Sequence, residues 1–177
     1  LVIGQKGTAG EYSAVGSVAP ITNILIGLFS GLSSGASVVI SQYFGAGNKE
    51  KVSEASHTSM TITLISGVVF TVLGVVFSPL MVQMMLRTTE GEVYAPATEY
   101  LTIYSCGMMF MLLYNMGSGI LRAVGDSRRP FYFLAVAAVI NTGLDFLFVY
   151  AFGMGVAGVA YATIIAQGVA ALLTVIT

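Results

Sequence analysis

Charged residues are scarce in this sequence. Seven basic and eight acidic side chains make up 8% of its 177 residues, whereas 56% are hydrophobic and the mean hydropathy is +0.88. Soluble globular domains carry about 25% charged residues, so this composition excludes an ordinary soluble protein. Nearly all of the charges lie in short polar connections or at the ends of apolar runs. The composition therefore indicates an integral membrane protein.

Cysteine, histidine and clustered basic residues are also nearly absent. Cys106 is the only cysteine, which excludes a disulfide within the chain and a CxxC metal site. His57 is the only histidine, and catalysis there would need a nucleophile in reach. The few basic residues are too dispersed to form a phosphate-binding surface. We therefore expect no enzyme, no cofactor, no catalytic residue, no metal site other than one for Na⁺, and no nucleic-acid partner.

Long apolar runs fill the sequence between the charges. Four of these runs carry no charge and a fifth is interrupted only by Asp145. Each is around or above the roughly 20 residues that span a bilayer, and longer than the apolar core of a signal peptide. The sequence therefore predicts an all-α, polytopic membrane helical bundle with five visible transmembrane helices, at approximately residues 15–45, 53–86, 93–123, 130–152 and 156–177.

The positions of Lys and Arg predict how these helices are oriented. Residues 45–54 and 122–129 carry most of the basic side chains. Loops rich in Lys and Arg lie on the cytoplasmic side of a cell's inner membrane, so we expect these two loops to face the cytoplasm. The connection that precedes the first predicted helix then faces outward, and the chain stops inside an apolar run. We therefore expect a further helix before Leu1 and more chain after Thr177.

Asp145 is the one charged side chain that lies inside an apolar run. A carboxylate at the centre of a membrane helix costs roughly 2.5 to 3.5 kcal/mol on insertion scales. Such residues commonly mark ion pathways or proton relays, so the cost favours a functional role. We interpret Asp145 as part of a site for a cation.

The last two predicted helices form a hairpin that places further oxygen atoms near this carboxylate. Counting about 1.5 Å per residue from the turn puts Asp145 and Thr163 about 10 Å below the outer end, and Asn141 and Gln167 at about 16 Å. Residues four apart share a helix face, so Asn141 and Asp145 lie on one face of their helix. Thr163 and Gln167 likewise share one face of the other helix. We predict that Asp145, Asn141 and Thr163 bind Na⁺ or a proton, with Gln167 behind them. The structural alternative is a neutral hydrogen-bond network between helices.

Two other polar features are interpreted more simply. Tyr114 and Asn115 prefer a wet or protein-lined environment to lipid, which makes them candidates for lining a substrate cavity. Gly27, Gly31 and Gly35 recur on one helix face, and we interpret them as a surface for close helix packing.

Three segments of the chain resemble a known family. They are GASVVISQYFGAG over residues 35–47, LRAVGDSRRP over residues 121–130, and GVAGVAYAT over residues 155–163. The third segment follows the Asn141 and Asp145 pair. Together they are similar to multidrug and toxic compound extrusion (MATE) transporters, which have two six-helix lobes. The resemblance implies a partial N-terminal lobe that lacks its first helix, with the C-terminal lobe also absent.

The resemblance also implies a function. It suggests a cation-coupled (Na⁺ or H⁺) antiporter that exports drugs or other organic compounds by alternating access, with a small organic substrate, a coupling cation, the lipid bilayer and the missing lobe as partners. In that family the cation site combines an aspartate of the first helix with positions matching Asn141, Asp145 and Thr163. Two alternatives stay open: a lipid-linked oligosaccharide flippase of the same superfamily, and a channel or non-transporting membrane subunit.

Overall fold

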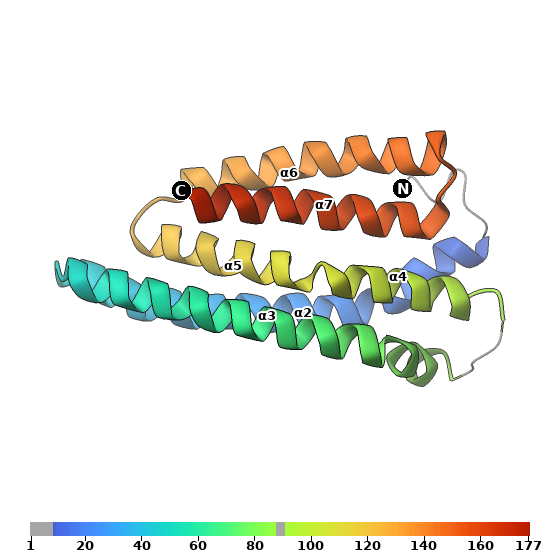
Figure 1. Ribbon diagram of the computed structural model, residues 1–177, viewed down its shortest axis with the longest axis horizontal. Coiled ribbons are helices and arrows are strands. Elements are labelled where there is room, and N and C mark those ends of the chain that lie inside the picture. Colours follow the sequence, from blue (N-terminus) through green and yellow to red (C-terminus); the bar gives the residue numbers. More distant parts are fainter. Residues whose placement is uncertain (1–8, 88–90) are drawn as a thin grey trace.

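The computed structural model describes residues 9–87 and 91–177, which fold as an all-helical bundle (Figure 1). The α4 and α5 helices lie end to end at its centre, between α7 on one side and α2 and α3 on the other, while α6 packs chiefly on α7. The predicted fold class is confirmed. The elements are α2 (Ala9–Gly45), α3 (Lys49–Leu86), α4 (Tyr94–Cys106), α5 (Met108–Ala123), α6 (Arg128–Phe146), the π-helical turn η1 (Leu147–Ala151) and α7 (Gly155–Ile176).

Local chemistry explains where α3 begins and ends. The side chain of Asn48 accepts a hydrogen bond from the backbone N–H of Lys51 at 3.0 Å, which satisfies a free donor of the first turn. Arg87 adopts the left-handed conformation with φ of 54°, and its N–H bonds the carbonyl of Gln83 to close the last turn. Because Asn48 supplies this cap, α3 begins four residues before the predicted start at residue 53.

The helix predicted over residues 93–123 is two helices, broken at Gly107. A Cβ atom built on Gly107 would lie 2.6 Å from Cγ1 of Ile164 and 3.3 Å from the carbonyl oxygen of Tyr104. Only a glycine therefore lets α7 approach this closely. Within the described residues, four helices are long and apolar enough to cross a membrane, and the collinear α4 and α5 together take the place of the fifth predicted span (Figure 1).

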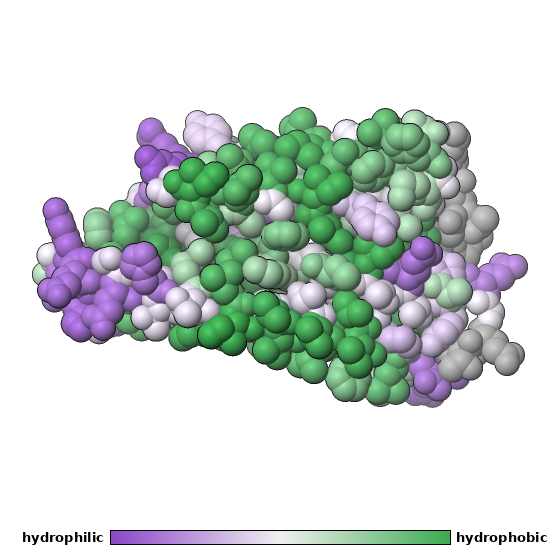
Figure 2. Space-filling view, viewed as in Figure 1, coloured by the Kyte–Doolittle hydropathy of each residue, from purple (hydrophilic) through white to green (hydrophobic). Residues whose placement is uncertain are grey.

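The surface has the distribution expected of a protein that faces lipid. Hydrophobic side chains cover the middle of the molecule and hydrophilic ones gather at its two ends (Figure 2). The core combines small and branched aliphatic side chains with aromatic and sulfur-containing ones, including Phe29, Tyr100, Tyr104 and Met108. By contrast, α3 presents a row of exposed apolar residues: Ile62, Ile65, Val68, Val69, Val72, Leu73, Val76, Phe77 and Leu80.

Helices approach closely where glycine meets serine or threonine. Ser33 on α2 donates a hydrogen bond to the backbone carbonyl of Asn115 at 2.6 Å, beside Gly119 on α5. A Cβ atom on Gly27, Gly31 or Gly35 would meet no atom within 4 Å in the described part of the chain. The packing role predicted for that row of glycines is therefore not fulfilled by any helix that the structure describes.

Two buried serines should respond in opposite ways to loss of the hydroxyl. The Oγ atom of Ser118 is buried and has no hydrogen-bond partner among residues 9–87 and 91–177, whereas Ser78 shares a hydrogen bond of 2.6 Å with Thr102. A buried hydroxyl without a partner costs stability, and interhelical hydrogen bonds contribute about 0.6 kcal/mol. We expect Ser118→Ala to keep or raise the thermal unfolding temperature of the full-length protein in detergent, and Ser78→Ala to lower it. The reverse order would contradict this description of the core.

Candidate cation site

The hairpin of α6 and α7 brings Asn141 and Thr163 together. The Nδ2 atom of Asn141 lies 3.5 Å from Oγ1 of Thr163, so the amide donates a long hydrogen bond to the hydroxyl. Thr163 in turn donates to the backbone carbonyl of Val159 at 2.9 Å. The donor of the threonine is thereby used within the protein, and the side-chain carbonyl oxygen of Asn141 is left as an acceptor.

The hydrogen-bond partner of Thr163 on α6 differs from the prediction. Asn141 donates to Thr163, and no hydrogen bond joins Asp145 to Thr163 among the described residues. Between Asp145 and the turn, η1 replaces α-helix. A π-helical turn takes in one more residue than an α-helical turn, so counting residues at about 1.5 Å each overestimates the depth of Asp145 and Asn141 by about the rise of one residue.

Asp145 and Gln167 each present a buried acceptor without a donor in the part of the chain that the structure describes. Oδ1 of Asp145 and Oε1 of Gln167 are inaccessible to solvent and have no hydrogen-bond partner there. Buried polar atoms are nearly always satisfied, and an unpaired carboxylate oxygen is among the most costly exceptions. A bound cation or a proton would satisfy such an oxygen. Carboxylate, amide and hydroxyl oxygens are also the hard ligands that small cations prefer.

Tyr100 is within electrostatic range of Asp145, a relation that the sequence did not reveal. It lies on α4, is 9% exposed, and stacks on Tyr104 with ring centroids 5.9 Å apart. Asp145 interacts with it electrostatically. Because 45 residues separate the two in the chain, only the packing of α4 beside the hairpin brings them near, and no spacing pattern could have indicated it.

Tyr114 and Asn115 use their polar groups inside the bundle. The hydroxyl of Tyr114 donates to the carbonyl of Pro130 at 3.1 Å, and Nδ2 of Asn115 donates to the carbonyl of Met111 at 2.8 Å. Both side chains are half-buried. These bonds explain the polar groups structurally, and the substrate role of the two residues stays a prediction.

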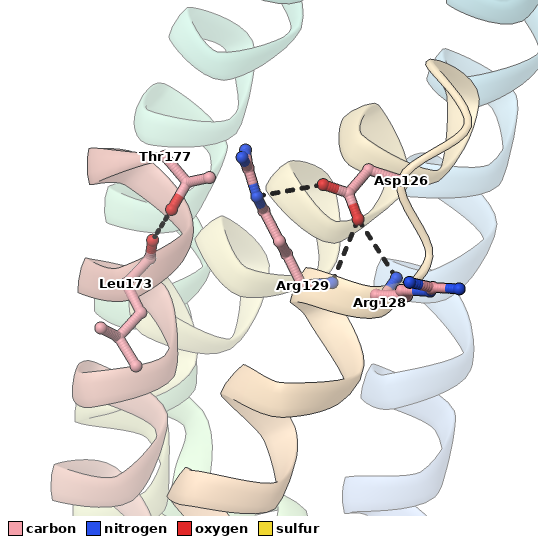
Figure 3. Close-up of polar contacts among 5 residues, drawn as sticks. All are labelled: Asp126, Arg128, Arg129, Leu173 and Thr177. Carbon is pink, nitrogen blue, oxygen red and sulfur yellow. Dashed lines mark hydrogen bonds and ion pairs between the residues drawn. The ribbon is translucent and has the colours of Figure 1, made fainter.

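The loop that starts α6 is held by Asp126. Its Oδ1 atom accepts hydrogen bonds from the backbone N–H groups of Arg128 and Arg129, at 3.2 and 3.1 Å, and Oδ2 pairs with Nε of Arg129 at 3.2 Å (Figure 3). This loop lies at the same end of the bundle as the turn between α2 and α3 (Figure 1). The two basic connections are therefore on one side, as an alternating path through a membrane requires.

Comparison with known families agrees with this geometry. Residues 1–147 match the MatE family. The chain belongs to this family of membrane transporters. Among curated MatE relatives, the probable multidrug resistance protein YoeA of Bacillus subtilis is 36% identical over 93% of this chain, and the probable multidrug resistance protein NorM of Thermotoga maritima is 33% identical over 78%. The FAD transporter of Shewanella oneidensis is 27% identical over 97%. The chain spans 36% of the length of the first of these relatives.

Solved MATE structures share the arrangement of the described helices. An inward-facing multidrug resistance MATE transporter aligns with 94% of this chain and 37% of its own, at 31% identity and a TM-score of 0.87. An outward-facing structure aligns with 92% of this chain and 36% of its own, at 32% identity and a TM-score of 0.86. The same set of helices therefore matches both states equally well, which indicates that its internal packing is retained in each.

Proposed function

We propose that the full-length protein is an antiporter that exports organic compounds from the cell through its inner membrane and is driven by Na⁺ or H⁺. The observation that carries this proposal is the unpartnered Oδ1 atom of Asp145 on the hairpin that also holds Asn141 and Thr163. A carboxylate kept in a membrane helix at such a cost needs a counter-ion or a proton. Relatives described as multidrug resistance proteins support the substrate class.

The site works as a coupling device in the following way. Na⁺ or a proton from outside binds at Asp145 and neutralises its charge, with the oxygens of Asn141 and Thr163 completing the surroundings of a metal ion. Discharge of the ion on the cytoplasmic side restores the carboxylate. Residues 45–54 and 122–129 face the cytoplasm in this proposal. The lobe formed by the described helices then moves as one body against the rest of the transporter, which the similar fits to inward- and outward-facing structures support.

Efflux from proteoliposomes tests the proposal directly. Full-length protein is reconstituted, loaded with a fluorescent organic cation, and exposed to a Na⁺ gradient or a pH gradient imposed separately. We expect saturable dye movement with one of the two gradients and none without either. Steady ohmic current in the absence of dye would instead indicate a channel and would overturn the proposal. Dye movement that ignores both gradients would overturn the coupling.

A further inference from the structure

The α6 helix changes its geometry immediately beside the candidate cation site. Its α-helical part ends at Phe146, one residue after Asp145, and η1 continues over Leu147–Ala151. The backbone N–H of Phe152 bonds the carbonyl of Leu147 at 3.1 Å, which is the wider π-type spacing. No proline lies between Pro130 and this turn, so proline does not cause the change. Isolated π-helical turns of this kind are frequent at functional sites.

The extra residue of η1 controls which way Asp145 faces. One residue corresponds to about 100° of rotation in an α-helix of 3.6 residues per turn. If the chain from Asn141 to Phe152 were wholly α-helical and fixed at its outer end, Asn141 and Asp145 would be rotated by about that angle away from α7. The contact between Asn141 and Thr163 therefore depends on the π-helical turn being kept.

Gly158 on α7 is the residue against which η1 packs. A Cβ atom built on Gly158 would lie 3.0 Å from Cβ of Phe148, 3.4 Å from its carbonyl carbon, and 3.1 Å from Cβ of Met154. These atoms belong to or adjoin the backbone and cannot rotate away. Gly158 also stands five residues before Thr163 on the same helix, so one helix carries both the packing contact and the threonine.

We propose that Gly158 is a positioning residue for the cation site: by letting the backbone of η1 pack directly on α7, it fixes the rotation and depth of Asn141 and Asp145 relative to Thr163. This inference rests on the proposed coupling function and adds a cause for the site's geometry. It also gives a role to the first half of the GVAGVAYAT segment, whose last residue is Thr163. The left-handed Gly155, with φ of 55°, begins α7 just before this contact.

The test compares two alanine substitutions on α7 in the full-length transporter. Gly158→Ala forces η1 away from α7, whereas a Cβ on Gly168 would meet its nearest atom, in the ring of Phe110, at an ordinary 3.9 Å. We expect Gly158→Ala to raise the half-saturating concentration of the coupling ion by about tenfold, the lower end of the loss seen when partners that orient ion ligands are removed. The maximal rate at saturating ion should change little, and Gly168→Ala should match the wild type in both quantities.

Ion-dependent thermal stabilisation of the purified protein gives a second readout without transport. Gly158→Ala should need about tenfold more ion for the same shift, by the same reasoning about ligand orientation. If Gly158→Ala fails to accumulate in the membrane, Phe148→Gly removes the Cβ atom of the same contact without adding atoms, and Phe131→Gly at the exposed start of α6 is its control. The inference would be overturned if Gly158→Ala had the same ion dependence as Gly168→Ala. Where the glycine variants of Phe148 and Phe131 are used instead, equal ion dependence in those two would overturn it. A wild-type protein that responds to neither ion would instead overturn the proposed function.

Discussion

Replacing Asp145 with asparagine should abolish ion coupling while leaving the protein at least as stable as the wild type. The substitution keeps the shape of the side chain and removes the charge that a cation or proton neutralises. Loss of a direct ligand should exceed the loss caused by removing a partner of a ligand, so we expect gradient-driven efflux to fall by at least about 100-fold. Efflux from proteoliposomes under the effective ion gradient measures this effect.

The stability of the same variant separates function from structure. Oδ1 of Asp145 has no hydrogen-bond partner among the described residues that asparagine would lose, and the variant avoids part of the roughly 2.5 to 3.5 kcal/mol that a charged aspartate costs on insertion. Its unfolding temperature in detergent should therefore stay level or rise. If Asp145 only held helices together, Asp145→Asn would instead lower the unfolding temperature and keep transport. That pair of results would refute the coupling role.

Asp126 provides a matched control because it is an acid with a known structural partner. Its carboxylate caps the first turn of α6 and pairs with Arg129 at 3.2 Å. Asp126→Asn should leave the half-saturating ion concentration unchanged. Equal losses of ion coupling in Asp126→Asn and Asp145→Asn would show that any loss of acid disables the protein, and would remove the argument for a specific site.

The second large effect is expected at Gly119, where α5 crosses α2. A Cβ atom there would overlap Oγ of Ser33, lie 2.6 Å from Oγ of Ser37 and lie 3.2 Å from the backbone carbonyl of Ser33. Gly119→Ala must therefore push α2 away and break the hydrogen bond from Ser33 to the carbonyl of Asn115. Overpacking of this kind costs about 1 to 3 kcal/mol, measured as a lower unfolding temperature of the full-length protein in detergent.

Two further variants make the Gly119 result specific. A Cβ atom on Gly143 of α6 would meet nothing within 4 Å among the described residues, so Gly143→Ala should cause no loss and can gain up to about 1 kcal/mol of helix propensity. Adding Ser33→Ala to Gly119→Ala removes the overlapping hydroxyl and should recover part of the loss, a non-additive result that marks direct contact. If the effects of Gly119→Ala and Ser33→Ala on stability were strictly additive, the loss in Gly119→Ala would not come from contact with Ser33.

The membrane helices were predictable because hydropathy gives a strong signal when an entire span must be apolar. The runs that contain α2, α3 and α7 needed only their length and lack of charge to be recognised. Helix ends were less predictable, because the start of α3 depends on one capping side chain, Asn48. The need for glycine at position 107, where the helix breaks, could not be read from the sequence, since the side chain that it makes room for is Ile164, 57 residues further along the chain.

The sequence predicted that the Asn141 and Thr163 helices face each other, and it did not predict the register between them. The four-residue spacing of Asn141 and Asp145, and the short turn before α7, were enough to place Asn141 and Thr163 on facing sides. The expected contact of Asp145 with Thr163 is not among the hydrogen bonds of the described residues, and the π-helical turn over Leu147–Ala151, which alters the register, has no recognised signature in its residues. The spacing of glycines was also a poor guide to packing, since the row at Gly27, Gly31 and Gly35 is regular but touches no described helix.

The lengths of α2 and α3 affect how far a motion of this lobe would carry their shared end. At 37 and 38 residues they are each about 55 Å long, nearly twice the roughly 30 Å of a bilayer's hydrocarbon core. Their shared tip, with residues 41–51 all exposed, extends past the loop before α6 (Figure 1). Because the shared end of these two helices protrudes so far, a small tilt of the lobe at mid-membrane would move that end through a much larger distance in the aqueous phase.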